Sequence, residues 1–379
     1  MYGPQLQESS PRSERRGAVR PPAQLRRPLV VAARLVLLAS VGLHAPAQAR
    51  LHPVRIDNPE GRALTLQEVD EGTGTLVTPR RLADPQIDLM LPLGRRFWVT
   101  VDSPSGACEL PIPLTARTVL PARLELRVPS VPERDPDFAF VPAGPSLVGD
   151  TLGVGQPDER PARVVDVAAF WIARFEVTNR DYAAFLDARL GTSASAWIDL
   201  GSRKCRIRRD EATGRHVSDH PEEPVVTVSH AGAVAYCAWR TEVSGSVHRL
   251  PTAVEWEKAA RGPRSATFSY GDIYERASAN QESGRLAAVG TSGPMTGFGT
   301  FDMTGNAFEW TADAYPSSAD EGDPGYRELR GGSFVLDGMY LRNAFRMKLR
   351  PGVRADDVGF RVVRELTQTD RPSEQENRR

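Results

Sequence analysis

The sequence predicts two folded parts of different class: a small all-β domain and, after it, a larger loop-rich domain that mixes strands with short helices. In residues 50–128, apolar and polar side chains alternate with a period of two, which is typical of half-buried strands. Later segments, near Thr178 and Thr252, carry signals for the start of a helix. The 379 residues also include 32 Gly and 31 Pro, which favour turns and loops.

Length and charge limit the possible functions. A chain of 379 residues exceeds the usual size of one domain and allows two. Lys plus Arg and Asp plus Glu number 48 each, so no net field draws the protein to phosphate backbones, and we expect no nucleic-acid partner. No apolar run reaches the roughly 20 residues that a membrane-spanning helix needs, so no transmembrane segment is expected.

Residues 1–49 have the pattern of an export signal peptide. Arginines lie between Arg12 and Arg27, an apolar stretch covers 35–43, and Ala47-Gln48-Ala49 precedes Arg50. We therefore expect a mature chain that begins at Arg50 and is periplasmic or secreted. The general export route is favoured, because the residues around the paired arginines fit a twin-arginine signal poorly. A disordered basic leader, or a start codon placed too early, is the alternative.

The small β domain is predicted over residues 50–128. Phe97, Val99 and Val101 alternate with Trp98 and Thr100. A second alternation runs from Leu124 to Val128, and together they favour a sandwich. No motif in this domain carries chemistry, so we interpret it as a spacer or adhesion module. The proline-rich and charged residues 129–137 predict a linker.

The second domain is predicted over 138–365. Thr178 is expected to cap a helix that buries Tyr182, Phe185 and Leu186 on one face.

Thr252 and Glu255 form a predicted capping box, and Gly262 fits the position just beyond the end of that helix. Trp239 and Trp256 are interpreted as core anchors. The polar tail 366–379 is expected to be disordered.

Three cysteines, Cys108, Cys205 and Cys237, exclude a disulfide framework, because an odd number cannot pair completely within one monomer. A Cys205–Cys237 bridge in an oxidising compartment stays open, whereas Cys108 is expected to be a small buried apolar residue.

Segments spread through the second domain carry a family resemblance. They are 170–179, 224–229, 249–257, 302–310, Arg330-Gly331-Gly332-Ser333-Phe334 and Gly359-Phe360-Arg361-Val362. In order and spacing they resemble the formylglycine-generating enzymes, also called sulfatase-modifying factors. The resemblance implies a compact α+β fold with little regular secondary structure, related in shape to C-type lectin domains.

Active members of that family carry two cysteines where Leu336 and Leu341 stand here. Those thiolates bind Cu(I), and a leucine side chain can neither ionise nor bind a metal. The residues therefore argue against copper and against formylglycine production. Ser333 and Tyr340 match positions that line the family's substrate cleft and are the candidate catalytic residues. A hydrogen bond from Ser333 to the backbone after the double glycine is an equal alternative.

The resemblance also implies a structural calcium ion. Asp302 and Glu309 would supply carboxylates, and Gly305 and Ala307 would supply carbonyl oxygens, the hard ligands that calcium prefers. The alternative is that Asp302 caps a turn and Glu309 pairs with an arginine, with no ion bound. A second calcium site of the family, which begins at a position matching Asn280, is expected to be lost.

His216, His220 and Glu222 match the letters of an iron site found in ergothioneine-synthesising relatives. Histidines four residues apart share a face only in a helix, and Gly214 and Pro221 disfavour one here. Iron is therefore not expected; His230 or His248 would be the third ligand if it bound. The adjacent Asp356 and Asp357 could be a catalytic acid and base. Neighbouring strand residues face opposite sides, however, so one of the two is interpreted as a turn former.

Two hypotheses of different class follow. The protein is an exported, divergent oxidoreductase of this family with an unknown substrate. The alternative is a non-catalytic binding module, or pseudoenzyme, that keeps the calcium-stabilised cleft to recognise a protein or small molecule. Both predict that the protein does not generate formylglycine.

Overall fold

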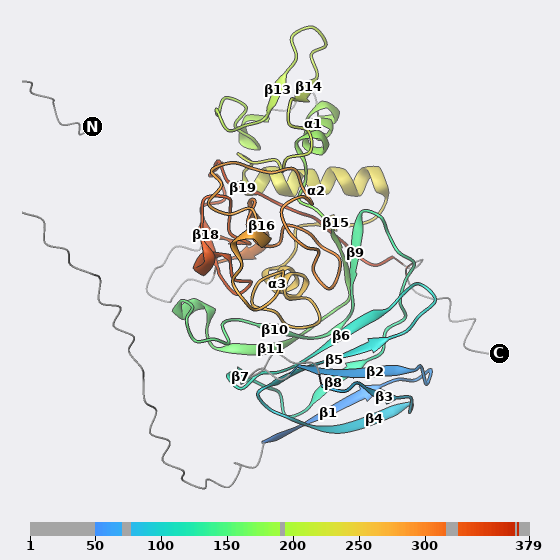
Figure 1. Cartoon of the computed structure of the whole chain (residues 1–379). Coiled ribbons are helices and arrows are strands. Elements are labelled where there is room, and N and C mark those ends of the chain that lie inside the picture. Colours follow the sequence, from blue (N-terminus) through green and yellow to red (C-terminus); the bar gives the residue numbers. More distant parts are fainter. Residues whose placement is uncertain (1–49, 70–76, 190–193, 316–324, 368–369, 371–379) are drawn as a thin grey trace, which may run out of the picture. The chain divides into compact units, whose positions relative to one another are not determined.

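Residues 50–69, 77–189, 194–315, 325–367 and 370 are described by the structure, which is a computed structural model (Figure 1). The predicted signal peptide 1–49 and most of the predicted tail 366–379 lie outside the described residues. No described helix is both long and apolar enough to cross a bilayer.

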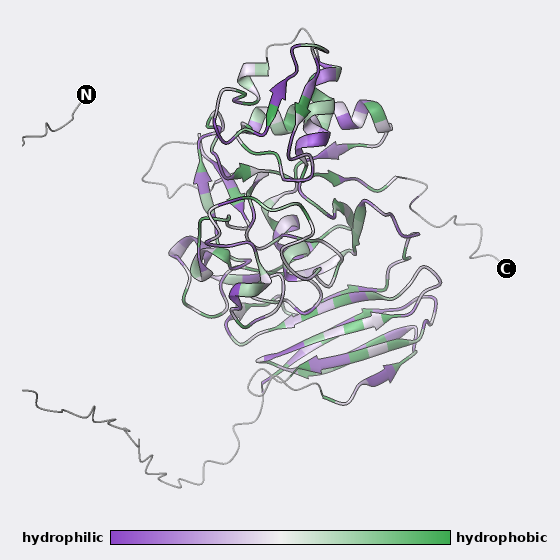
Figure 2. Ribbon diagram, turned by 45° about the horizontal axis from the view of Figure 1, so that its top comes forward, coloured by the Kyte–Doolittle hydropathy of each residue, from purple (hydrophilic) through white to green (hydrophobic). Residues whose placement is uncertain are grey.

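Two sheets built from residues 51–127 enclose one apolar core. In the first, the order is β4–β1–β8, from Gln86–Pro92, Leu51–Asp57 and Leu124–Arg127. In the second, the order is β3–β2–β5–β6, from Arg80–Leu82, Leu64–Val69, Arg95–Val101 and Cys108–Leu114. Side chains of both sheets, including Ile56 and Ile112, share the core. Figure 2 shows alternating apolar and polar segments along these strands.

The predicted alternation is confirmed in β8 and broken in β5. Leu124 and Leu126 are buried, and Glu125 and Arg127 are exposed. In β5, Trp98 is as buried as its neighbour Val99. The reason is that Arg264, from the later part of the chain, stacks over the Trp98 ring at 5.2 Å and covers the second face of the strand.

The early and later parts of the chain share a sheet. Strand β7 (Thr118–Val119) pairs in parallel with β11 (Ala162–Val167), which pairs antiparallel with β10 (Gly144–Val148). Strand β10 also packs against β6 (Figure 1). Residues 51–127 are therefore joined to the later part by backbone hydrogen bonds as well as by side chains.

In its described residues, the later part combines short sheets with three α-helices. The helices are α1 (Asn179–Ala188), α2 (His230–Ser244) and α3 (Ala253–Arg261). One sheet has the order β15–β20–β12–β9, from His248–Arg249, Val363–Arg364, Phe170–Ala173 and Phe138–Val141. A second has the order β18–β17–β16–β19, from Met347–Leu349, Arg327–Arg330, Phe308–Ala314 and Val358–Gly359. A hairpin joins β13 (Ile207–Arg209) and β14 (His216–Ser218).

Both predicted helix starts are confirmed. The Thr178 side chain accepts from the Asp181 amide, and Thr252 and Glu255 form a reciprocal capping box. Helix α3 ends at Arg261, and Gly262 just beyond it has a φ of 61°, a region that favours glycine. The face of α1 that carries Tyr182 and Phe185 is buried in an aromatic cluster with Tyr236, Trp239 and Phe360.

All three cysteines are free. The Cys205–Cys237 bridge that the sequence left open is not formed. Cys108 lies in the core between the first two sheets, as predicted. Burial raises the pKa of Cys108 and of Cys237 to about 12, so both thiols are protonated near neutral pH.

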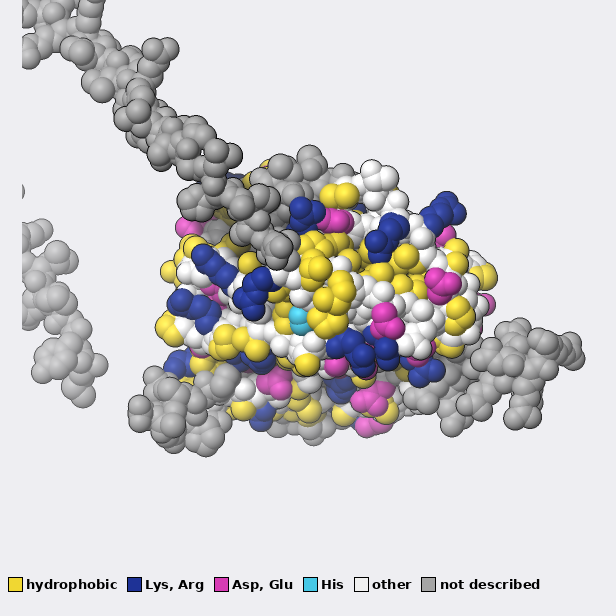
Figure 3. Space-filling model, turned by 90° about the horizontal axis from the view of Figure 1, so that it is seen from below, with side chains coloured by type: hydrophobic (Ala, Val, Ile, Leu, Met, Phe, Trp, Pro, Cys, Tyr) yellow, Lys and Arg dark blue, Asp and Glu magenta, His cyan; other side chains and the backbone are white. Residues whose placement is uncertain are grey.

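The lower face of the molecule carries apolar side chains among charges of both signs (Figure 3). Leu51 of β1 and Met90 of β4 are among the exposed apolar residues. Because the charges are mixed, this face has no single-sign field.

Candidate functional site

A double glycine positions the loop that follows β17. Gly331 and Gly332 have φ of 95° and 73°, a region that favours glycine. A Cβ on Gly332 would lie 2.3 Å from Leu341 Cδ2 and 3.0 Å from the Tyr340 carbonyl oxygen. The glycine therefore lets the short 3-10 helix Gly338–Leu341 pack directly against the end of the strand.

Leucine side chains occupy both positions that the family resemblance assigns to a cysteine pair. Leu341 is fully buried, at 0% exposed. Leu336 is partly buried and packs against the main core cluster. Neither residue offers a ligand atom, and among the described residues no three His, Cys, Asp or Glu side chains come together in a group that could hold a metal ion.

Buried arginines hold the loop 331–345 in place. Arg330 donates to the carbonyl oxygens of Asn343 (3.0 Å) and Phe345 (3.2 Å), and to the Glu257 carboxylate (2.8 Å). Arg342 makes a two-pronged pair with Glu159, at 2.6 and 2.9 Å. Charge-assisted, bidentate bonds of this kind fix geometry as well as charge. These buried bonds therefore anchor both ends of the loop 331–345 to the rest of the domain.

The structure settles the partner of Ser333. Its hydroxyl is fully buried and donates to Asp357 Oδ2 at 2.8 Å. The alternative of a bond to the backbone is therefore wrong, and the reason is that a carboxylate 24 residues later lies within reach. Asp356 turns the other way and accepts from Ser202, so the two aspartates do not form an acid–base pair.

Tyr340 belongs to an exposed apolar patch. We call Tyr274, Val335, Met339 and Tyr340 the loop patch; each is between 42% and 52% exposed. The Tyr274 ring lies against Gly338, where a Cβ would be 2.7 Å from the ring, so two distant segments meet here. No motif in the sequence pairs Tyr274 with this loop. The other three patch residues, Val335, Met339 and Tyr340, could have been found from the sequence, because they are apolar and adjoin Leu336 and Leu341.

Glu309, a predicted calcium ligand, is bound to an arginine. Arg361 donates to both of its oxygens at 2.7 Å, and Trp256 Nε1 donates to Oε2 at 2.8 Å. A carboxylate offers about four lone-pair sites, so three are already used. For Glu309 the arrangement fits the alternative of an arginine partner better than it fits calcium.

Asp302 lies in a buried group with excess negative charge. Its carboxylate accepts from the Gly290 amide, and burial raises its pKa. Glu176 is also buried; burial, with the Asp302 charge second, raises its pKa well above the usual range. Glu176 Oε2 has no hydrogen-bond partner among the described residues. Asp302 and Glu176 are therefore two buried carboxylates within electrostatic range of each other.

The three residues that match an iron motif point to different partners. His216 lies in strand β14 rather than in a helix, and its Nδ1 contacts Asp187 at 2.8 Å. His220 pairs with Glu223 at 3.0 Å, and Glu222 pairs with Arg180. His230 and His248 bond to backbone carbonyls through a ring nitrogen. His216, His220 and Glu222 therefore lie in a hairpin and the turn after it and do not share one face of a helix.

Comparison with known proteins adds independent findings. Residues 126–366 match the family described as "Sulfatase-modifying factor enzyme 1-like domain". The chain is 30% identical over 275 residues to "Inactive C-alpha-formylglycine-generating enzyme 2" of Mus musculus, covering 61% of this chain and 86% of that protein. It is 29% identical over 289 residues to "Formylglycine-generating enzyme" of Streptomyces coelicolor, covering 60% and 89%.

The chain is also similar to a further enzyme and to a solved structure. "Hercynine oxygenase" of Mycolicibacterium thermoresistibile is 34% identical over 253 residues, which cover 57% of this chain and 55% of that protein. Among solved structures, "Structure of PvdO from Pseudomonas aeruginosa" matches with a TM-score of 0.48 and 28% identity, over 60% of this chain and 94% of the other.

Proposed function

The chain belongs to the sulfatase-modifying factor family, and from that premise we propose that it is a recognition protein that binds the kind of peptide that active relatives oxidise, without oxidising it. The observation that carries this proposal is the replacement of both copper-binding cysteines by packed leucines, Leu336 and Leu341. The similarity to a relative whose name includes "inactive" supports it.

The loop patch supports recognition of an apolar peptide segment. Its side chains, including Val335, Met339 and Tyr340, are about half exposed and lie in the loop that carries Leu336 and Leu341. Burying such side chains in a complex contributes roughly 25 cal/mol per Å² of apolar surface. The loop is already fixed by Arg330 and Arg342, so little ordering cost opposes binding.

The state of Ser333 supports binding rather than chemistry. Its proton is committed to Asp357, and the residue is closed to solvent. A hydroxyl in this position stabilises the loop and does not face a reacting atom.

A divergent oxidoreductase is the second candidate, favoured by the similarity to "Hercynine oxygenase". It would need a redox metal at residues other than Leu336 and Leu341. Elemental analysis of the purified protein distinguishes the two candidate functions. Stoichiometric iron or copper favours the oxidoreductase. A protein that binds the peptide but contains neither metal favours recognition.

Export and calcium are further parts of the proposal. The leader pattern in residues 1–49 supports a periplasmic or secreted protein, and protein N-terminal sequencing should start at Arg50. A calcium ion at Asp302, with the carbonyls of Gly305 and Ala307, is supported by the excess buried negative charge beside Glu176. One calcium per chain in the purified protein is the expected result.

A binding experiment with a matched pair of peptides tests the proposal. A fluorescent sulfatase-type peptide and its Cys-to-Ser analogue should bind with equal affinity, because no thiolate chemistry is involved. The variants Met339→Ser and Tyr340→Ser should each weaken binding about fivefold, by removing apolar contact. Val243→Ser, at an exposed position on α2, is the control and should bind as wild type. No binding of either peptide, or equal binding by every variant, would overturn the proposal.

A further inference from the structure

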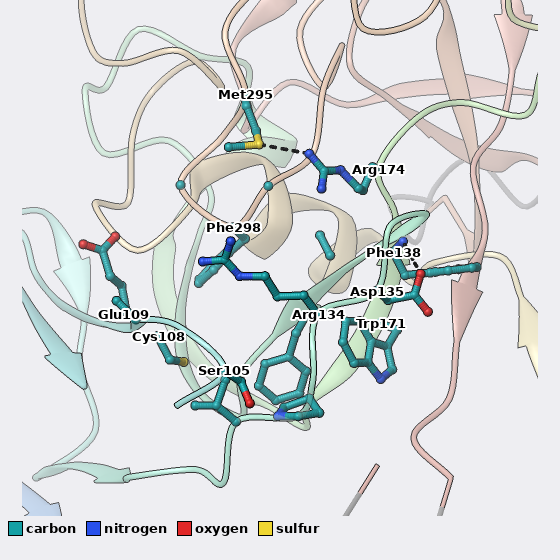
Figure 4. Close-up of a pocket in the computed structure, with 17 residues that line it drawn as sticks. Ser105, Cys108, Glu109, Arg134, Asp135, Phe138, Trp171, Arg174, Met295 and Phe298 are labelled. Atoms are coloured by element: carbon teal, nitrogen blue, oxygen red, sulfur yellow. Dashed lines mark hydrogen bonds between the residues drawn. The ribbon is translucent and has the colours of Figure 1, made fainter. Parts of the chain in front are cut away.

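A cavity separate from the loop patch lies where the first β part meets the later part. Its volume is about 400 Å³, within the range of small-molecule sites. Its walls come from three stretches of chain: Ser105 to Glu109 at the start of β6, Val131 to Phe140 across the predicted linker, and Met295 to Gly299. Trp171 and Arg174, at and just after β12, complete it (Figure 4).

The inner wall of the cavity is aromatic. Phe140 and Trp171 pack with ring centroids 5.4 Å apart, and Phe138 and Phe298 line the same space. The Cys108 thiol adds an uncharged surface, because burial raises its pKa to about 12. Walls of this kind bind a flat apolar body by stacking and by burial of its surface.

Two guanidinium groups in the cavity lack a carboxylate partner. No hydrogen bond or ion pair joins Arg134 to any described residue. Arg174 contacts the Met295 sulfur at 3.4 Å, and its Nε is buried without a hydrogen-bond partner among the described residues. Figure 4 shows Arg134 extended across the cavity and Arg174 pointing toward Met295.

The carboxylates of the cavity do not cancel that charge. Asp135 is already paired with Arg364 at 3.2 Å and caps the amides of Asp137 and Phe138. Burial raises the pKa of Glu109 and the nearby Arg264 charge acts in the opposite direction, so this carboxylate also has a cationic neighbour that does not line the cavity. The cavity therefore combines an aromatic wall with two guanidinium groups, Arg134 and Arg174, that no described carboxylate binds.

From this combination we propose that the cavity is a binding site for a small organic anion, with an aromatic body against Phe140 and Trp171 and a carboxylate or sulfonate group between Arg134 and Arg174. Arginine matches such a group because its planar fork donates two parallel hydrogen bonds to two oxygens. The bound ligand would contact both parts of the chain and stabilise their junction by mass action.

Two fluorescent probes that differ only in charge and substituent test the site. The full chain should bind 8-anilinonaphthalene-1-sulfonate at least tenfold more tightly than the neutral N-phenyl-1-naphthylamine. Arg134→Gln and Arg174→Gln should each weaken sulfonate binding about tenfold, the loss expected for one charge-assisted hydrogen bond, and leave the neutral probe unchanged. Arg123→Gln is the charge-matched control, because Arg123 is exposed, lies just before β8 and does not line the cavity.

Hydrogen exchange locates the bound probe. Sulfonate should protect segments 131–140 and 294–299, and Tyr340→Ser in the loop patch should leave its affinity unchanged. Thermal unfolding of each variant shows that it is folded before binding is measured. The proposal is overturned if the two probes bind equally, if Arg134→Gln and Arg174→Gln bind as wild type, or if protection appears only at 335–340. The last result would place the probe on the loop patch, so this test and the peptide test fail separately.

Discussion

At the scale of single residues, the Glu309–Arg361 pair sets the chemistry of the predicted calcium segment. Both side chains are fully buried, and Glu309 is the carboxylate that Arg361 hydrogen-bonds, whereas Asp302 and Glu176 act on Arg361 only through space. Removing one partner of such a pair costs more than the pair contributes, because the remaining charge stays buried.

Glu309→Gln should therefore lower the free energy of unfolding by about 3–5 kcal/mol, measured by urea denaturation. Glu365→Gln, which removes an exposed partner of Arg249, is the control and should change stability by less than about 1 kcal/mol. The account predicts the same loss for Glu309→Gln with calcium or with EGTA. A loss seen only with calcium would show that Glu309 is an ion ligand and would contradict the assignment to Arg361.

Lys258 gives stability a dependence on pH. Its ammonium group is buried and donates to the carbonyl oxygens of Pro142 (2.6 Å) and Gly144 (3.0 Å), and burial lowers its pKa to about 7. Between pH 7 and pH 10 the unfolded chain holds a proton that the folded chain has released, so this group makes stability rise with pH.

The Lys258→Met variant should lose that rise. Unfolding free energies at pH 7 and pH 9 should differ less in the variant than in wild type, and Lys204→Met, at an exposed lysine, should behave as wild type. Parallel pH curves for Lys258→Met and wild type would show that the folded protein keeps this lysine charged.

At the scale of elements, the loop 331–345 keeps its supports while its two metal-binding positions hold leucine. Arg330 and Arg342 bind the loop through charge-assisted bonds, and Gly332 allows the 3-10 helix to pack closely. By the family resemblance, this loop therefore differs from that of active members in the side chains at positions 336 and 341.

Leu336→Cys combined with Leu341→Cys should create Cu(I) binding, because two thiolates suit this soft ion. Competition with a chromophoric Cu(I) chelator should give about one copper per double variant and less binding by either single variant. Double-variant binding no stronger than wild type would mean that the loop does not bring positions 336 and 341 together.

Local signals in the sequence predicted local structure well. The caps at Thr178 and Thr252 depend on residues three positions away, so the sequence contains the whole interaction. Features set by distant residues were not predictable. Burial of Trp98 depends on Arg264, and the hydrogen bond of Ser333 depends on Asp357. The family resemblance identified the loop 331–345 in the sequence. The contacts of its side chains were known only from the structure.

At the scale of the whole molecule, the two parts of the chain are structurally linked. Strand β7 pairs with β11, β6 packs against β10, and Arg264 covers Trp98. The family match begins only at residue 126, so most of the first part is an addition to the family domain that shares surface with it.

Removal of residues 50–125 should therefore destabilise the remainder. The truncated chain would expose the edge of β11 and the face of β10, and exposed edges favour aggregation. We expect a lower midpoint of thermal unfolding and oligomers on size-exclusion chromatography. A truncated chain that stays monomeric with an unchanged midpoint would show that the contacts between the parts contribute no stability.

Leucine at positions 336 and 341 and the exposed loop patch are the two observations behind the proposal of binding without turnover. The most direct test of this account is mass spectrometry of a sulfatase-type cysteine peptide after incubation with the purified protein, copper and oxygen. The account predicts that the peptide keeps its cysteine and that no aldehyde appears, while an active formylglycine-generating enzyme converts it under the same conditions. Aldehyde formed by the wild-type chain, with Leu336 and Leu341 in place, would contradict the account.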